Sequence, residues 1–154
     1  MNVLKHAELT EKILGAFYQV YGVLGYGFSE KVYENALAIE LRSLGFQVQQ
    51  QSPIKVHYRN AVVGDYVADI VVQDLVILEI RATASLLDEH EAQLLNYLKA
   101  TTYEVGLLLN FGPKPDIRRK VYDNPRKGAL TWTRRIRTRT NADNTEKKGD
   151  GATD

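Results

Sequence analysis

The stretch ADIVVQDLVILEIRA, residues 68–82, constrains the fold of this chain more than any other segment. Two aliphatic runs meet at a Gln-Asp pair, which indicates two buried strands joined by a tight turn. Each run nevertheless carries an acid, Asp69 in the first and Glu79 in the second, and Arg81 follows two positions later. Because burying an unpaired carboxylate is costly, these two acids need a compensating partner.

The length of the turn decides whether the two acids meet. A two-residue turn at Gln73 and Asp74 places Asp69 opposite Leu78, one position out of register with Glu79. A bulge or a longer turn brings the acids together. Two close carboxylates repel each other unless one is protonated or a cation lies between them, and Mg²⁺ commonly takes one or two carboxylates. The alternative is that each acid pairs with a nearby arginine or lies at an exposed strand end.

Hydrophobic periodicity predicts the remaining elements. Apolar residues at helical spacing precede the acidic strands, with Thr10 and Ser29 as N-caps and Gly45 after the second helix. Val32 and Ile39 are expected on the apolar face of that second helix. The predicted elements are helices at 9–24 and 29–44, strands at 46–51, 54–58, 68–72 and 75–81, a helix at 85–101, a strand at 104–111 and an edge strand at 129–136.

This order of elements predicts an α/β (α+β) fold. A strand meander followed by a helix and a further strand gives a mixed central sheet with helices packed on its faces. The length of 154 residues suits one domain, which we expect to span residues 1–135. Residues 136–154 are basic and then polar, lack apolar anchors and are expected to form a disordered tail.

Composition and charge narrow the class of protein. The chain has no cysteine, which excludes disulfides, thiolate metal sites and a cysteine nucleophile. No apolar stretch approaches the roughly 20 residues that span a bilayer, so no membrane association and a cytoplasmic location are expected. Residues 1–113 carry 8 Lys/Arg and 13 Asp/Glu, whereas residues 114–139 carry 10 and 2. A basic flank of this kind occurs among nucleic-acid binders and fits a solvated surface face equally well.

Three motifs carry a resemblance to a known family. The spacing of Asp69, Glu79 and Arg81 resembles the D-x(n)-(D/E)-x-K signature of the PD-(D/E)xK nuclease superfamily, whose restriction-endonuclease-like core has a similar order of elements (αβββαβ, here with an extra N-terminal helix). GFSEKVY, residues 27–33, is similar to the G-x-x-E-x-x-Y motif of a group of small proteins placed within that superfamily. HEAQLLNYLKAT, residues 90–101, resembles a helix of the same group.

The resemblance implies a divalent-metal site. Asp69 and Glu79 would coordinate one or two Mg²⁺ or Mn²⁺ ions, with the carbonyl of Ile80 as a further ligand. Glu30, in the G-x-x-E-x-x-Y motif, would complete the acidic cluster or orient a metal-bound water. The implied reaction is metal-assisted attack of water on a phosphodiester bond of nucleic acid, DNA in particular.

The resemblance also implies roles for Gln93 and Tyr97, which lie four positions apart and therefore share one helical face. They would point into the same cleft and steady the site or the nucleic-acid backbone. Each motif residue has a structural alternative. Glu30 complements a helix dipole, Tyr33 and Tyr97 are core aromatics with hydroxyls at the surface, and Gln93 is a plain surface residue.

The chain departs from the signature at Arg81, where the family pattern calls for lysine. Arginine binds phosphate oxygens bidentately, but it is a poor general base because its pKa stays above about 12. Three interpretations stay open. Arg81 clamps phosphate in a working enzyme, or Lys99 or Lys55 reaches the site instead, or catalysis is weakened and the domain binds nucleic acid or a protein partner.

The leading hypothesis is a small magnesium-dependent nuclease, a hydrolase of phosphodiester bonds that acts on DNA as a homodimer or with a partner protein. The main alternative is a non-catalytic nucleic-acid-binding or protein-interaction module on the same fold. A metal-free structural protein with its acids in surface pairs is a third alternative.

Overall fold

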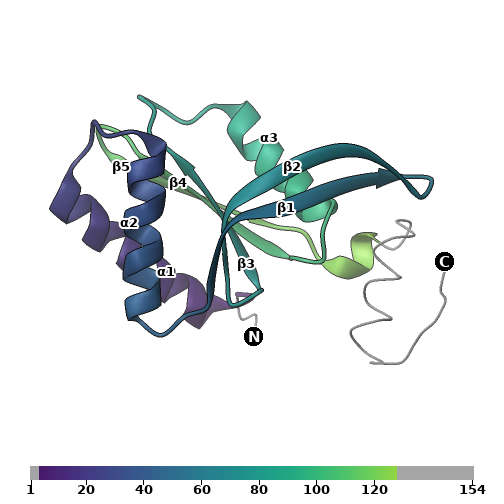
Figure 1. Cartoon of the computed structure of the whole chain (residues 1–154), viewed down its shortest axis with the longest axis horizontal. Helices are drawn as coiled ribbons and strands as arrows, with labels where there is room; N and C mark the ends of the chain where they lie inside the picture. Colours follow the sequence, from purple (N-terminus) through teal and green to yellow (C-terminus); the bar gives the residue numbers. More distant parts are fainter. Residues whose placement is uncertain (1–3, 128–154) are drawn as a thin grey trace.

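The computed structural model describes residues 4–127, which form three α-helices, a five-stranded sheet and a short final 3₁₀ helix (Figure 1). The elements are α1 (Ala7–Leu24), α2 (Glu30–Ser43), β1 (Val48–Tyr58), β2 (Ala61–Val72), β3 (Val76–Arg81), α3 (Asp88–Lys99), β4 (Val105–Phe111), β5 (Pro115–Val121) and η1 (Asn124–Lys127). The predicted mixed sheet with flanking helices is confirmed. Within residues 4–127, no helix is long and apolar enough to cross a membrane.

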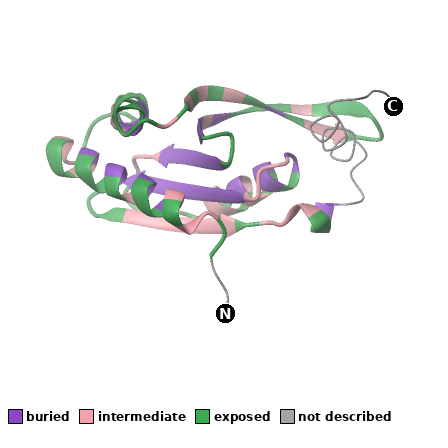
Figure 2. Cartoon of the chain, turned by 90° about the horizontal axis from the view of Figure 1, so that it is seen from below, coloured by how far each residue is buried: buried purple, intermediate pink, exposed green. Residues whose placement is uncertain are grey.

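The strands lie in the order β1-β2-β3-β4-β5. β3 and β4 pair in parallel because α3 connects them, and the other neighbouring strands pair antiparallel. The parallel pair lies at the centre of the sheet and is buried on both faces, which explains its unbroken aliphatic sequence. Figure 2 shows burial concentrated in these central strands and decreasing toward β5 and the outer part of β1 and β2.

Two apolar layers cover the two faces of the sheet. Phe17 of α1 and Tyr33 of α2 pack with Ile80 of β3 on one face. Leu94 of α3 packs with Ile77 of β3 in the second layer. Since successive strand residues point to opposite faces, Glu79 shares the α3 face with Ile77. The acid at the end of β3 therefore faces the third helix.

β1 and β2 form a long ribbon that extends past the rest of the sheet (Figure 1). The two strands predicted on either side of Pro53 are one continuous strand. A proline is tolerated there because β1 is an edge strand, where a missing ladder hydrogen bond costs less. The ribbon turns at Arg59 and Asn60, both with positive φ (51° and 69°), as a tight hairpin turn requires.

Several predicted boundaries are wrong. α1 begins at Ala7, so Thr10 lies inside the helix, where its hydroxyl donates to the Ala7 carbonyl at 3.1 Å. Ser29 is the N-cap residue of α2, as predicted, although its side chain makes no capping hydrogen bond. Val32 and Ile39 are exposed, because Glu34 and Ala38 occupy part of the buried face of α2.

β5 was not predicted, since Pro113 and Pro115 mask a strand whose residues alternate only weakly between apolar and charged. It pairs along the whole of β4 and completes the sheet. The predicted edge strand at 129–136 and the predicted tail at 136–154 lie outside the described residues.

Candidate active site

Asp69 and Glu79 lie across from each other at the ends of β2 and β3. The pairing of Val72 with Val76 and of Ile70 with Leu78 leaves a three-residue turn, so the predicted two-residue turn is wrong. Extending the observed register by one position places Asp69 opposite Glu79. The longer turn thus brings the acids together, which was the alternative that the sequence left open.

Both carboxylates are fixed by backbone hydrogen bonds. The N–H of Asp69 donates to Glu79 Oε2 at 3.0 Å, and the N–H of Ile80 donates to Asp69 Oδ2 at 2.8 Å. Regular pairing of β2 with β3 stops at Ile70 and Leu78, so the side chains take over hydrogen bonds that the ladder no longer makes. The positions of the two acids are therefore set by the sheet itself.

Burial makes it costly for both acids to carry a negative charge. The Glu79 side chain is 5% exposed and the Asp69 side chain 23%. Burial, followed by the neighbouring charge of Asp69, raises the pKa of Glu79 to about 8. Burial also raises the pKa of Asp69 above its ordinary value. Such a site favours binding either a proton or a cation.

The guanidinium of Arg81 supplies a cation to this site. Nη1 donates to the carbonyl of Ile80 at 2.9 Å and lies 3.9 Å from Asp69 Oδ2 and 3.7 Å from Glu79 Oε1. Nη2 donates to Oε1 of Gln93 at 2.8 Å. The sequence offered two alternatives, acids that lie close together or acids that pair with an arginine. The structure shows both at once.

α3 brings Gln93 and Tyr97 to the same place. Gln93 contacts Arg81 directly, and the Tyr97 side chain is buried one turn further along the helix. Burial, and next the charge of Glu79, raises the pKa of the Tyr97 hydroxyl to about 12, so that hydroxyl stays protonated at neutral pH. The ring centroid of Tyr97 lies 5.7 Å from that of Tyr66 on β2.

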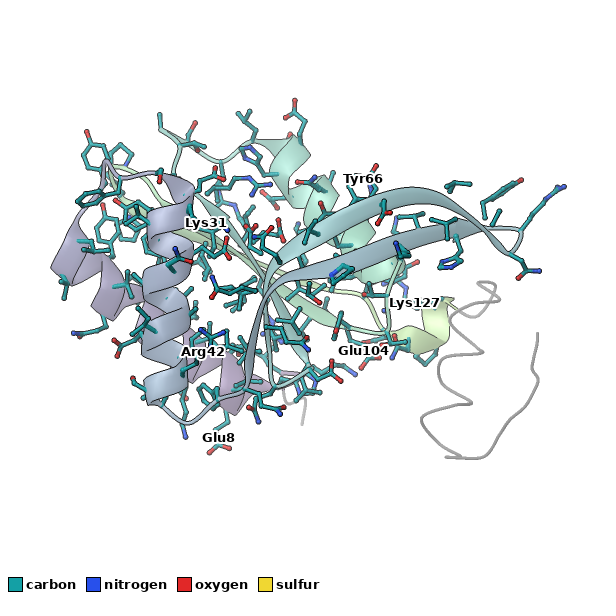
Figure 3. The ribbon with its side chains drawn as sticks, in the orientation of Figure 1. Glu8, Lys31, Arg42, Tyr66, Glu104 and Lys127 are labelled. Atoms are coloured by element: carbon teal, nitrogen blue, oxygen red, sulfur yellow. The ribbon has the colours of Figure 1, made fainter. Side chains whose placement is uncertain are left out.

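A cavity of about 630 Å³ opens beside the acids, between the β1–β2 ribbon and α3. Tyr66 stands on the ribbon at this cavity (Figure 3), and Gln93 and Tyr97 line both the cavity and the acidic site. The remaining lining residues are Val56, His57, Val63, Gly64, Glu89, Ala92, Asn96, Lys99 and Ala100. Gln93 and Tyr97 thus connect this open groove to the acidic site, although neither acid lines the groove itself.

The G-x-x-E-x-x-Y residues form the turn into α2. Gly27 has a φ of 118°, which favours glycine. The Tyr33 hydroxyl donates to the Gly25 carbonyl at 2.7 Å and accepts from the Phe28 N–H at 3.2 Å, while its ring stacks on Phe111 at 4.3 Å. Tyr33 is thus a core aromatic whose hydroxyl ties the turn together.

Glu30 is the first residue of α2 and is exposed. Its charge contributes to the raised pKa of Glu79, so it lies within electrostatic reach of the acids. Among residues 4–127, however, no three His, Cys, Asp or Glu side chains are close enough to share a metal ion. The structure brings Asp69, Glu79, Ile80, Arg81, Gln93 and Tyr97 together and leaves Glu30 at the rim.

Sequence reasoning missed Glu34 and Gln51. Glu34 is 3% exposed and accepts hydrogen bonds from Lys31 at 3.1 Å, from Gln50 at 2.8 Å and from Gln51 at 2.9 Å. Figure 3 places Lys31 on α2. The charge of Glu34 raises the pKa of Asp69, whereas a hydrogen bond from the Gln51 side chain lowers it. Glu34 lies four residues after Glu30, and this helical spacing is the signal that could have revealed it.

Gln51 is also unusual in its backbone. Its φ of 56° is rare for a residue with a side chain, and the β1–β2 pairing is interrupted between Gln50 and Ser52. The same register would pair Gln51 with Asp69. Nothing in the local sequence QVQQQS signals this interruption.

The two lysines considered as substitutes for the signature lysine do not contact the acids. Lys55 pairs with Asp65 at 3.1 Å on the exposed ribbon, and the Lys99 ammonium lies over the Tyr122 ring, 5.6 Å from its centroid.

Part of the basic flank forms ion pairs within the domain. Arg118 and Lys120 of β5 pair with Glu91 of α3, at 3.1 Å and 2.7 Å. The flank beyond residue 127 lies outside the described residues.

The fold and the acidic site define a nuclease-like class of domain, and comparison with known proteins agrees. Residues 7–120 match the PD-(D/E)XK nuclease superfamily, and the chain belongs to that superfamily. A crystal structure of SSO0001 is similar, with 18% sequence identity and a TM-score of 0.49, over 77% of this chain and 60% of that one. The present chain thus spans less than two thirds of SSO0001. No curated protein matched.

Members of the PD-(D/E)XK superfamily generally use divalent metals, and the oxygen groups of this site suit such an ion. Asp69 and Glu79 supply carboxylates, and Ile80 supplies a backbone carbonyl next to them. Hard oxygen ligands of this kind are those that Mg²⁺ and Mn²⁺ prefer. The raised pKa of Glu79 also indicates a site that favours a cation, because a bound cation would offset the burial of Glu79 and its repulsion by Asp69.

Proposed function

We propose that this chain is a metal-dependent nuclease of the GxxExxY type that hydrolyses phosphodiester bonds in nucleic acid, with DNA as its substrate. The observation that carries the proposal is the direct opposition of Asp69 and Glu79, each held by a backbone N–H of the other's strand. Two neighbouring carboxylates, one buried and one partly buried, repel each other, and a bound divalent cation relieves that repulsion.

Asp69, Glu79 and the carbonyl of Ile80 would hold Mg²⁺ or Mn²⁺ in this proposal. When bound, such an ion lowers the pKa of water and stabilises charge on the phosphate. Arg81 binds a phosphate oxygen and offsets its charge, since a guanidinium matches phosphate geometry. Gln93 orients Arg81, Tyr97 offers a protonated hydroxyl to the substrate, and Glu30 at the rim orients water.

The groove between the ribbon and α3 gives the nucleic-acid strand a path to the acids. The exposed Tyr66 offers an aromatic ring at its wall, and aromatic side chains stack on bases without regard to sequence. The proposal further assigns residues 1–135 to one domain and places the enzyme in the cytoplasm, acting as a homodimer or with a partner protein. The absence of cysteine from the whole sequence is compatible with a reducing compartment.

Cleavage of plasmid and single-stranded DNA by the full chain, with Mg²⁺ or Mn²⁺, tests the proposal. Asp69→Asn should reduce the rate by more than about a hundredfold, beyond what losing an outer partner of a metal ligand costs. Asp65→Asn is the matched control, because Asp65 lies on the same strand and pairs with Lys55 on the exposed ribbon. Absence of cleavage by the unmodified chain, or equal rates for Asp69→Asn, would refute the enzymatic proposal.

A second candidate is a catalytically weakened member that binds nucleic acid or a protein partner. The contact of Arg81 with both acids favours it, because a cation already lies where the chemistry needs one. This candidate expects DNA affinity that falls with salt, survives Asp69→Asn and drops when Arg134, Arg135, Arg137 and Arg139 are changed to glutamine. Salt-independent binding would favour a protein partner instead.

A further inference from the structure

The Arg81 guanidinium engages the same three oxygen groups that would hold a metal ion. Its Nη1 atom lies 2.9 Å from the Ile80 carbonyl, 3.7 Å from Glu79 Oε1 and 3.9 Å from Asp69 Oδ2. A divalent ion bound by these oxygens would lie against Nη1, and two cations at van der Waals contact repel each other strongly in a partly buried site. Arg81 in this position and a metal ion at the acids therefore exclude each other.

Arg81 makes no short hydrogen bond to either carboxylate. Its hydrogen bonds go to two neutral oxygens, the Ile80 carbonyl and the Gln93 amide. Its contacts with the two carboxylates, at 3.7 Å and 3.9 Å, are longer than the roughly 2.7–2.9 Å of a charge-assisted hydrogen bond. A phosphate group offers a guanidinium two such bonds at once, so it can compete with the present partners for Arg81.

The net charge of the site also favours exchange of Arg81 for a divalent ion once a phosphodiester is bound. Two carboxylates and one guanidinium leave a net charge of −1 if both acids are ionised, and a divalent ion would reverse it. A phosphodiester that draws Arg81 away brings its own negative charge and releases both acids. The Arg81 side chain is 16% exposed, and its hydrogen-bond partner Gln93 lines the groove, so a phosphate bound in the groove beside Gln93 would lie next to Arg81.

We propose that Arg81 is a built-in cation that makes metal binding at Asp69 and Glu79 conditional on a phosphodiester. Metal ion and nucleic acid then bind cooperatively. A phosphodiester that binds Arg81 frees the acids for the metal ion, and a metal ion at the acids frees Arg81 for the phosphodiester. This regulation rests on the proposed nuclease site. Thermodynamic linkage requires the coupling to be reciprocal, and couplings between sites typically change affinity by roughly 5- to 150-fold.

Calorimetric titration of the full chain with Mn²⁺ tests the proposal without relying on cleavage. Arg81→Met should bind Mn²⁺ at least about tenfold more tightly than the unmodified chain. A short oligodeoxynucleotide with charged, hydrolysis-resistant methylene phosphonate linkages should strengthen Mn²⁺ binding about tenfold in the unmodified chain and by clearly less in Arg81→Met, where only the direct attraction between ion and phosphonate is left. Arg59→Met, at the exposed turn of the ribbon, is the matched control and should behave as the unmodified chain does.

Two further variants keep the test decisive. Adding Glu79→Gln to Arg81→Met should abolish the gain, which assigns the ion to this site. If Arg81→Met does not fold, Gln93→Leu removes the Nη2 partner while keeping the arginine, and should strengthen Mn²⁺ binding severalfold. Equal Mn²⁺ affinities for the unmodified chain, Arg81→Met and Gln93→Leu, with no effect of the oligonucleotide but with binding lost on adding Glu79→Gln, would overturn the role of Arg81 and leave the metal site standing. No Mn²⁺ binding in any variant or condition would overturn the proposed function as well.

Discussion

Asp69 and Glu79 are joined through the main chain, because the N–H of Asp69 donates to Glu79 Oε2 at 3.0 Å. In the other direction, the Ile80 N–H donates to Asp69 Oδ2, so a hydrogen bond runs each way between the two strands. The two carboxylates thus continue the pairing of β2 and β3 after the regular ladder has stopped. Because their geometry belongs to the sheet, substitutions here should change stability as well as the proposed ion binding.

Stability should therefore depend on pH through Glu79. Its pKa of about 8 in the folded chain lies above the ordinary value of 4.5, so the folded state binds this proton more tightly than the unfolded state does. The stability that Glu79 contributes is therefore fully present below about pH 4.5, falls as pH rises from there to about 8, and levels off above that. The raised pKa of Asp69 acts in the same direction.

Glu79→Gln should flatten this part of the pH profile, because glutamine keeps the acceptor for the Asp69 N–H but does not titrate. Urea denaturation at intervals across the same pH range measures the effect. Glu11→Gln, on the exposed side of α1, serves as the control and should retain the slope of the unmodified chain. An unchanged slope in Glu79→Gln would show that another group is responsible.

The Tyr33 hydroxyl should contribute to stability apart from its ring. Tyr33→Phe keeps the stack on Phe111 but removes the bonds to the Gly25 carbonyl and the Phe28 N–H, so we expect a loss of about 1–2 kcal/mol in the free energy of unfolding. Tyr26→Phe, in the loop that leads into α2 and 62% exposed, should change it by less than about 0.5 kcal/mol. Chemical denaturation compares the two, and equal effects would contradict the assignment.

Much of the fold could be predicted from the sequence because its signals are local. Long apolar periodicity located the three helices, and unbroken aliphatic runs located β3 and β4. β5 escaped because its residues, PDIRRKV, are only partly buried and alternate weakly. The continuity of β1 through Pro53 escaped too, since only the edge position of that strand makes the proline tolerable.

The site was predictable in its residues but not in its geometry. Asp69 and Glu79 stand out in sequence as acids within aliphatic runs, yet whether they meet depends on one extra turn residue. The roles of Glu34 and Gln51 depend on how α2 lies against β1, and contacts between distant segments have no local signal. The same holds for the contact of Arg81 with Gln93, twelve residues away in the chain.

A close approach of two loops should make Gly112 sensitive to substitution. A Cβ added there would lie 2.3 Å from the Thr83 carbonyl oxygen, which is held in place by Asn110. Gly112→Ala should therefore destabilise the chain by about 1–3 kcal/mol. Gly15→Ala, in the middle of α1 with open space around it, should stabilise it by about 0.5–1 kcal/mol. Thermal unfolding of both variants checks the opposite signs, and a neutral Gly112→Ala would show that the loop can move.

Tyr66 should contribute to nucleic-acid binding if the groove carries the substrate strand. Tyr66 is 46% exposed, and its ring lies beside that of Tyr97 at the wall of the groove. Stacking of one base on an aromatic ring contributes about 1–3 kcal/mol, so Tyr66→Leu should weaken binding of a labelled single strand by about tenfold or more.

Tyr58→Leu is the matched control for this measurement. Tyr58 is 62% exposed and lies next to the turn of the same ribbon, outside the lining of the groove. Fluorescence anisotropy at fixed salt should show little change for Tyr58→Leu, because a phosphate-dominated contact does not depend on that ring. If both variants weakened binding equally, the strand would follow the outer ribbon rather than the groove, and the path to Asp69 and Glu79 would have to be reassigned.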